Sequence, residues 1–358
     1  MGHPDSSPPP SPAPTVRDLR IDAAKGIAIL LVVIGHARGV PGTLVLLAYS
    51  FCVPLFFFLS GWLGRRGRDR PPGQALAAMS RTLLVPYACF FLLAYAYWLL
   101  TRHVGEKAAR WGDLPWWDPF TGFLTGIGPD LYVQPALWFL PALFTTAMAW
   151  LLLARRLRPG MIALLCLPLA LLWIAVFPPT RLRLPFGLDV LPVALFFYAC
   201  GAFASTTLPL PRTIGRGLAG AALLAAPWLW LAWSNGRVDV NQLRFGASGL
   251  AFILAALCGT GVVLMASPLA ARSAALCWIG RNSLLILCTH FLVFFVLSGV
   301  ASLAGLFAHD ARPGLAWALS ISAIAVAACV PMRAVLVRHA PWALGLRTPA
   351  RPPATAVA

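Results

Sequence analysis

The chain has 358 residues, of which 59% are hydrophobic and only 11% charged. Ordinary globular domains carry about 25% charged residues, so this composition excludes a soluble globular fold and predicts a protein that crosses a membrane many times. The net charge of +17 comes from arginines scattered between apolar segments, with no single basic face. We therefore expect a lipid bilayer as partner and no nucleic acid.

The eight cysteines are dispersed and mostly lie inside apolar runs, without any Cys-x-x-Cys pair. This pattern predicts neither a disulfide framework nor a zinc site, and we expect no bound metal and no permanently bound cofactor. The cysteines are expected to pack as small buried side chains.

Residues 1–16 are rich in proline and serine and are predicted to form a disordered cytoplasmic tail. Residues 17–340 are predicted to form an all-α transmembrane bundle, and 341–358 a cytoplasmic C-terminal tail. The bundle divides into about ten apolar spans, each near the roughly 20 residues that a membrane helix needs. They are 20–40, 43–64, 75–101, 135–154, 160–177, 188–206, 214–234, 246–267, 280–305 and 314–336.

Basic residues are unevenly distributed between the two sides of this bundle. Leaving out Lys25, the tails and alternate connections carry 18 arginines, and the opposite side carries nine arginines and lysines. Positive charge near membrane helices favours the cytoplasm. The count predicts a multi-pass plasma-membrane protein with both termini inside. The longest connection, 102–134, is then outside, where its tryptophans form an interfacial belt or stack on a sugar.

The first span contains three ionisable residues, Asp22, Lys25 and His36. Each such residue costs roughly 2.5–3.5 kcal/mol at the centre of a membrane helix, so their presence needs a reason. Lys25 and His36 are about three helical turns apart and share one face, with His36 about 16 Å further along the axis. Asp22 shares that face and can pair with Lys25. The spacing predicts a polar stripe facing the protein interior, unless Lys25 and His36 only reach toward opposite membrane surfaces.

Five sequence blocks resemble the acyltransferase 3 family of integral membrane O-acyltransferases. They are the basic-x10-His motif from Lys25 to His36, the run from Phe51 to Trp62, the segment from Arg81 to Tyr87, the stretch from Leu137 to Phe144, and the run from Gly280 to His290. Within the family, the likeness is to surface-polysaccharide acetyltransferases of the fucose 4-O-acetylase type. Lys25 stands where many members have arginine, and Cys52 stands where histidine is frequent.

The resemblance implies transfer of an acyl group, usually acetyl from acetyl-CoA, to a hydroxyl of an extracytoplasmic or lipid-linked saccharide. It implies His36 as general base or transient acyl carrier, because neutral histidine suits both tasks. Lys25 is expected to bind donor phosphates or to orient Asp22. Arg81 is expected to anchor its helix at the interface or to contact those phosphates.

Three further residues are secondary candidates. His290 lies seven residues after Ser283 on one helix face, which makes both of them secondary site candidates. The alternative interpretation of His290 is a structural hydrogen bond to another helix. Ser60 is a secondary candidate for a nucleophile, but no Gly-x-Ser-x-Gly pattern surrounds it, and small residues there also permit close helix packing.

Two other functions compete with acyl transfer. A transporter or flippase of a glycan or glycolipid would use the same polar stripe without covalent chemistry, since intramembrane Asp, Lys and His also form proton relays. A non-catalytic scaffold would leave the stripe unexplained.

Overall fold

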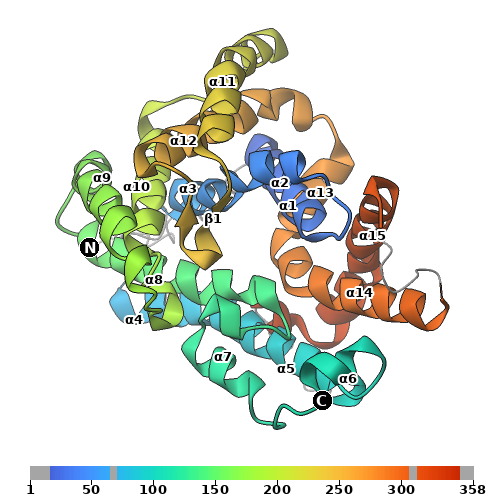
Figure 1. The fold of residues 1–358 in the computed structure, drawn as a ribbon. Coiled ribbons are helices and arrows are strands. Elements are labelled where there is room, and N and C mark those ends of the chain that lie inside the picture. Colours follow the sequence, from blue (N-terminus) through green and yellow to red (C-terminus); the bar gives the residue numbers. More distant parts are fainter. Residues whose placement is uncertain (1–16, 65–70, 306–312, 347–358) are drawn as a thin grey trace, which may run out of the picture.

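The computed structural model describes residues 17–64, 71–305 and 313–346, and the predicted tail 1–16 lies outside this part (Figure 1). The described chain is almost entirely helical. Its α-helices are α1 (Leu19–His36), α2 (Gly42–Tyr49), α3 (Cys52–Gly64), α4 (Pro72–Met79), α5 (Val85–Thr101), α6 (Glu106–Trp111), α7 (Pro119–Thr125), α8 (Phe139–Leu153), α9 (Pro159–Val176), α10 (Leu191–Thr207), α11 (Ile214–Asn235), α12 (Gly249–Ala270), α13 (Ala274–Arg281), α14 (Ser283–Leu303) and α15 (Leu315–His339).

Short 3₁₀ and π segments and one small hairpin complete the described part. They are η2 (Ser80–Leu84), η3 (Gly128–Asp130), η4 (Pro135–Trp138), η5 (Pro178–Thr180), η6 (Pro185–Gly187), η7 (Val240–Gln242), η8 (Pro341–Leu344), β1 (Val238–Asp239) and β2 (Arg244–Phe245). The two strands pair antiparallel, with Val238 opposite Phe245 and Asp239 opposite Arg244. The segment η8 lies within the predicted C-terminal tail and packs against α5 and α15.

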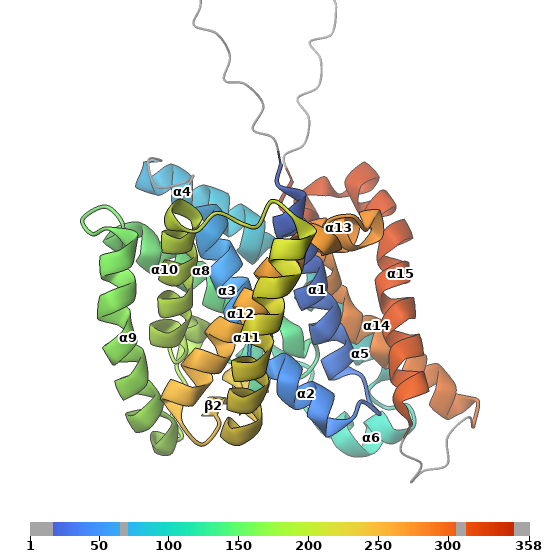
Figure 2. The same cartoon turned by 90° about the horizontal axis from the view of Figure 1, so that it is seen from above.

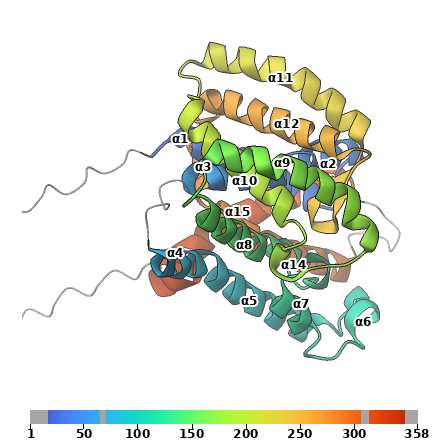
Figure 3. The same cartoon turned by 90° about the vertical axis from the view of Figure 1, so that its left-hand side faces the viewer.

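The all-α polytopic bundle is confirmed, and a helical segment lies at each of the ten predicted spans. Eight of these segments are long and apolar enough to cross a membrane by themselves. The other two are α10, which has 17 residues, and α1, which carries three charged side chains. The long helices run side by side through the bundle (Figure 3).

The bundle has two ends that are separated along the helix axes (Figure 2). One end holds the start of α1 together with α4 and α13, and we call it the N-terminal face. The other end holds α2, α6 and the β1–β2 hairpin, and we call it the hairpin face. Because α1 runs from one face toward the other, Lys25 lies near the N-terminal face and His36 near the hairpin face.

The second predicted span is broken into α2 and α3 at Ser50 and Phe51. Pro54 lies in the first turn of α3, where its missing N–H needs no partner, and its ring would clash with the Ser50 carbonyl in a continuous helix. The Ser50 hydroxyl instead donates to the Leu47 carbonyl at 2.7 Å and accepts from the Trp228 indole at 3.0 Å. The break redirects α2, so that Tyr49 lies beside the end of α1.

A second proline distorts the third span. Residues Ser80–Leu84 form a single π turn just before Pro86, which cannot supply the N–H that a regular α-helix would use. Arg81 lies in this π turn, so its side chain leaves the helix in a direction that a regular helix would not give.

Glycines allow α3 and α10 to cross at backbone contact distance. A Cβ atom on Gly61 would lie 1.9 Å from the Tyr198 carbonyl oxygen, and one on Gly201 would lie 1.8 Å from the Phe58 carbonyl oxygen. Small residues permit this close approach in membrane bundles. The crossing fixes α3 against the most buried helix of the bundle, α10.

Replacing Gly61 with alanine is expected to lower the midpoint of thermal unfolding in detergent, because the added methyl group must force α3 and α10 apart. Overpacking of this kind costs about 1–3 kcal/mol. Gly73 is the matched control, since a Cβ atom there meets nothing within 4 Å. Equal melting of the Gly61→Ala and Gly73→Ala proteins would show that the crossing is looser than described.

Candidate active site

His36 and His290 are brought together from opposite ends of the sequence. His36 is the last residue of α1 and His290 lies in the middle of α14. The His36 Nδ1 atom is 3.2 Å from the His290 Nε2 atom, and the two rings stack with centroids 5.3 Å apart. Of the candidates predicted from sequence, these two form a direct contact.

The hydrogen bonds fix which nitrogen atoms carry protons when both rings are neutral. His290 Nδ1 lies 2.8 Å from the Ile286 carbonyl oxygen, which only accepts, so this nitrogen must donate. The Nε2 atom of neutral His290 is then an acceptor, and His36 Nδ1 must donate to it. His36 is left with an unprotonated Nε2 atom, which is the atom that a general base or nucleophile requires.

Aromatic side chains surround this histidine pair. The Phe291 ring lies 4.7 Å from both imidazole centroids, and Tyr49 meets the edge of His36 at 5.8 Å. His290 has no exposed surface, whereas His36 is only half-buried. His36 is therefore the member of the pair that keeps some exposed surface.

Asp22 does not form the predicted ion pair with Lys25. Its carboxylate, 3% exposed, accepts two hydrogen bonds from the Arg17 guanidinium, at 2.6 and 2.8 Å. Arginine provides this two-point geometry, which the single ammonium of lysine cannot. Lys25 is half-buried within electrostatic range of Asp22, and its ammonium has no hydrogen bond to any residue in the described ranges.

The predicted polar stripe on α1 is interrupted. Ile29 and Val32 lie on the same helix face between Lys25 and His36 and are only 1% and 7% exposed. Their side chains pack into the apolar core rather than along an open passage. The face therefore has two polar ends separated by about three turns of helix, with apolar packing between them.

The remaining sequence candidates lie apart from the histidine pair. Ser283 begins α14 about two turns before His290, and Ser60 is half-buried in α3. Arg81 lies near the N-terminal face, and its Nε atom is buried without a hydrogen-bond partner among the described residues. The structure thus groups Lys25, Arg81 and Ser283 with the N-terminal half of the bundle and the two histidines with the other half.

Gln134 is a buried polar residue that the sequence reasoning missed. Its side chain has no exposed surface, and its Nε2 atom donates to the Cys288 carbonyl of α14 at 2.7 Å. Its Oε1 atom has no partner in the described chain. A lone glutamine just before an apolar run gives no recognisable signal, and only the fold shows that it braces the helix carrying His290.

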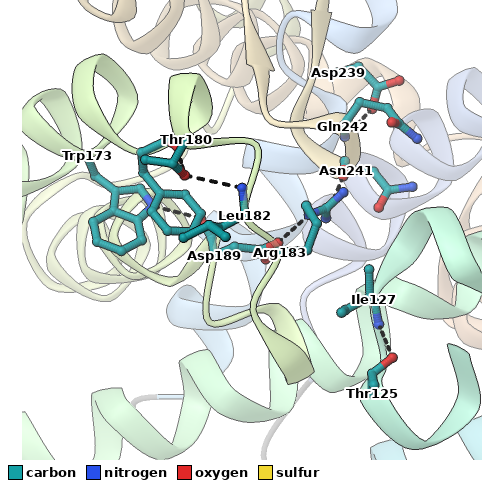
Figure 4. A network of polar contacts seen from close by, with 11 residues as sticks. Thr125, Ile127, Trp173, Thr180, Leu182, Arg183, Asp189, Asp239, Asn241 and Gln242 are labelled. Atoms are coloured by element: carbon teal, nitrogen blue, oxygen red, sulfur yellow. Dashed lines mark hydrogen bonds and ion pairs between the residues drawn. The ribbon is translucent and has the colours of Figure 1, made fainter. Parts of the chain in front are cut away.

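A second polar network, also missed, ties the loops of the hairpin face together (Figure 4). The Arg183 guanidinium binds the buried Asp189 carboxylate at 2.6 Å and donates to the Asn241 carbonyl at 2.9 Å. The Trp173 indole donates to the Asp189 carbonyl at 2.7 Å. These contacts join the α9–α10 connection to the hairpin.

Comparison with known proteins identifies the family of the chain. The sequence profile described as an acyltransferase domain, Acyl_transf_3, matches residues 18–334. The chain belongs to the acyltransferase 3 family. Neither the curated proteins nor the solved structures give a significant match.

The acyltransferase 3 match covers both histidines, Lys25 and Arg81, so the chain is a multi-pass membrane acyltransferase. Within the described residues, no three His, Cys, Asp or Glu side chains are grouped to hold a metal ion. Tyr49 and Phe291 are aromatic neighbours of the histidine pair.

Proposed function

We propose that this acyltransferase moves an acetyl group from acetyl-CoA to a hydroxyl of an extracytoplasmic or lipid-linked saccharide, with His36 as the reacting group. The observation that carries the proposal is the His36–His290 hydrogen bond, because it leaves a lone pair on the His36 Nε2 atom. The fucose 4-O-acetylase likeness of the sequence blocks supports a saccharide acceptor.

The reaction starts from this lone pair. As general base, His36 Nε2 takes the proton of the sugar hydroxyl while its oxygen attacks the thioester carbonyl carbon. The carbon–sulfur bond breaks, and the proton passes to the departing thiolate. As acyl carrier, the same Nε2 atom attacks the thioester carbonyl carbon first, and the carbon–sulfur bond breaks to release a thiolate. The sugar oxygen then attacks the acetyl carbon, the carbon–Nε2 bond breaks, and the hydroxyl proton passes to the thiolate. In both routes, His290 Nε2 accepts a stronger hydrogen bond from His36 Nδ1 when His36 becomes positively charged.

The donor is expected at the N-terminal face, which the arginine bias assigns to the cytoplasm. Lys25 and the unpartnered Arg81 Nε atom offer positive charge to the phosphates of acetyl-CoA. Because Ile29 and Val32 fill the helix face between Lys25 and His36, the pantetheine arm must displace these side chains or pass along a neighbouring helix. Both termini in the cytoplasm and a plasma-membrane location belong to this proposal.

Replacing Lys25 with alanine is expected to raise the KM for acetyl-CoA about tenfold or more, since a charge-assisted contact to phosphate is worth about 1.5–3 kcal/mol. The KM for the acceptor should change little. Lys25→Arg is the matched control, because it keeps the charge. An unaltered donor KM in Lys25→Ala would remove Lys25 from the donor site.

The transporter alternative is tested with purified protein in sealed vesicles. Radiolabelled acetyl-CoA is supplied on one side, and label in a saccharide acceptor is measured. Transfer of label supports the proposed reaction. Movement of unmodified glycolipid across the membrane, without label transfer from any acyl-CoA, would favour the transporter or flippase.

A further inference from the structure

The hairpin face contains a pocket whose charged side chains have no assigned role. Its volume is about 520 Å³, and the residues lining it include Pro178, Pro179, Asn235, Arg237, Arg244 and Gly246. It lies between the β1–β2 hairpin and the α9–α10 connection, which the Arg183–Asn241 hydrogen bond ties together. Two elements that are far apart in sequence therefore form its walls.

The hairpin presents both arginines to solvent on one side. Side chains alternate along a strand, and the buried Val238 and Phe245, which are 1% and 5% exposed, anchor one side of the hairpin in the core. Arg237 and Arg244 are exposed on the other side. The Asn235 side chain fixes the hairpin base by donating to the Phe245 carbonyl at 2.9 Å and accepting from the Ser248 N–H at 2.8 Å.

Neither the Arg237 nor the Arg244 guanidinium group is held by a hydrogen bond or an ion pair to another residue of the described ranges. Asp239 lies in electrostatic range of both, but it does not line the pocket and accepts from the Gln242 N–H at 3.2 Å. Burial raises the pKa of the Asp239 carboxyl, and the two arginines act in the opposite direction. The pocket thus offers two free planar donors of the kind that bind phosphate at two points.

The position of the pocket indicates where its ligand comes from. Trp230 and Trp233, near the end of α11, are 70% and 65% exposed, and exposed tryptophans gather at the level of lipid headgroups. The pocket follows α11 directly, so its arginines lie at this level. Basic residues are less frequent in the loops on the outer side of a membrane than in cytoplasmic loops. Two arginines at one pocket there therefore indicate an anionic ligand.

The pocket is linked to the histidine pair through Tyr49. The Tyr49 ring contacts His36, and its hydroxyl is within electrostatic range of Arg237 and Asp239. Helix α2, which carries Tyr49, also packs against β1. A phosphate held at the hairpin therefore lies on the same face of the bundle as the reacting imidazole.

We infer that Arg237 and Arg244 bind the phosphate or diphosphate of a lipid-linked acceptor and so hold its saccharide near His36. This inference rests on the proposed function for the role of the ligand, but the phosphate site itself can be tested without any transfer reaction.

The test measures binding of farnesyl diphosphate to the full-length protein in detergent by isothermal titration calorimetry. Arg237→Gln and Arg244→Gln are each expected to raise the Kd about tenfold to a hundredfold. Arg110→Gln, which removes an exposed arginine from α6, should leave the Kd unchanged. Asp239→Asn should lower the Kd, because it removes a negative charge that lies in electrostatic range of both arginines.

Three comparisons decide the source of the phosphate. Inorganic diphosphate should bind more weakly than farnesyl diphosphate, and phosphatidylglycerol should not compete. Equal binding of inorganic diphosphate, effective competition by phosphatidylglycerol, or an unchanged Kd in both arginine variants would overturn the inference. Arginine-dependent binding without acetyl transfer by the wild type would instead overturn only the proposed function. Acetyl transfer with an unchanged acceptor KM in both variants would overturn only this inference.

Discussion

Replacing His36 with alanine is expected to lower the rate of acetyl transfer by about 10²–10⁴-fold, the range that a positioned proton-transfer group contributes. The His36 Nε2 atom carries the lone pair that the hydrogen bonds leave free, and His36 is only half-buried. Label transferred from acetyl-CoA to the saccharide acceptor measures the effect, with protein amount and melting temperature matched between the variants.

His339 provides the control for this change. It is an exposed histidine near the end of α15, remote in sequence from both members of the pair, and His339→Ala should transfer label like the wild type. Undiminished transfer by the His36→Ala protein would show that the reaction does not pass through this imidazole.

Replacing His290 with leucine is expected to lower kcat by about tenfold to a hundredfold, the value of one hydrogen bond to a charged group. Without the His290 Nε2 acceptor, the proton on His36 Nδ1 loses its partner when the ring becomes positively charged. His290 has no exposed surface, so it acts by positioning His36. The KM for acetyl-CoA should stay close to that of the wild type.

Two variants separate this positioning role from a packing role. His290→Gln restores an acceptor oxygen and should recover much of the lost kcat. Thr289→Val changes an equally buried neighbour, whose hydroxyl bonds only within α14 and to Cys329, and it should keep the wild-type kcat. Equal loss of activity in His290→Leu and His290→Gln would show that the hydrogen bond does not position His36. A change in both kcat and the KM for acetyl-CoA in His290→Leu would show the same.

Much of the architecture followed from the sequence because a bilayer leaves few choices. Every backbone group must be paired within the membrane, so apolar runs of about 20 residues form helices, and the predicted boundaries lie within a few residues of those observed. The sixth span starts at Leu191 instead of 188 because Pro192 has no N–H to bond the Leu188 carbonyl, so it is accommodated in the first turn of α10. The break at Ser50 was not predicted, because 43–64 was expected to form one span; the structure shows that it accommodates Pro54.

The site was only partly accessible to sequence reasoning. The spacing of Lys25 and His36 fixed their shared face, and the family likeness singled out His36, because both depend on local helix geometry and motif. Tertiary structure decided what the more distant groups meet: His290 is 254 residues from His36, and Arg237 lines a pocket together with residues 178–179. Asp22 pairs with Arg17, a local contact at the start of α1, because the guanidinium binds both carboxylate oxygens. Helix periodicity determines which way a side chain points, whereas packing between helices determines what it meets.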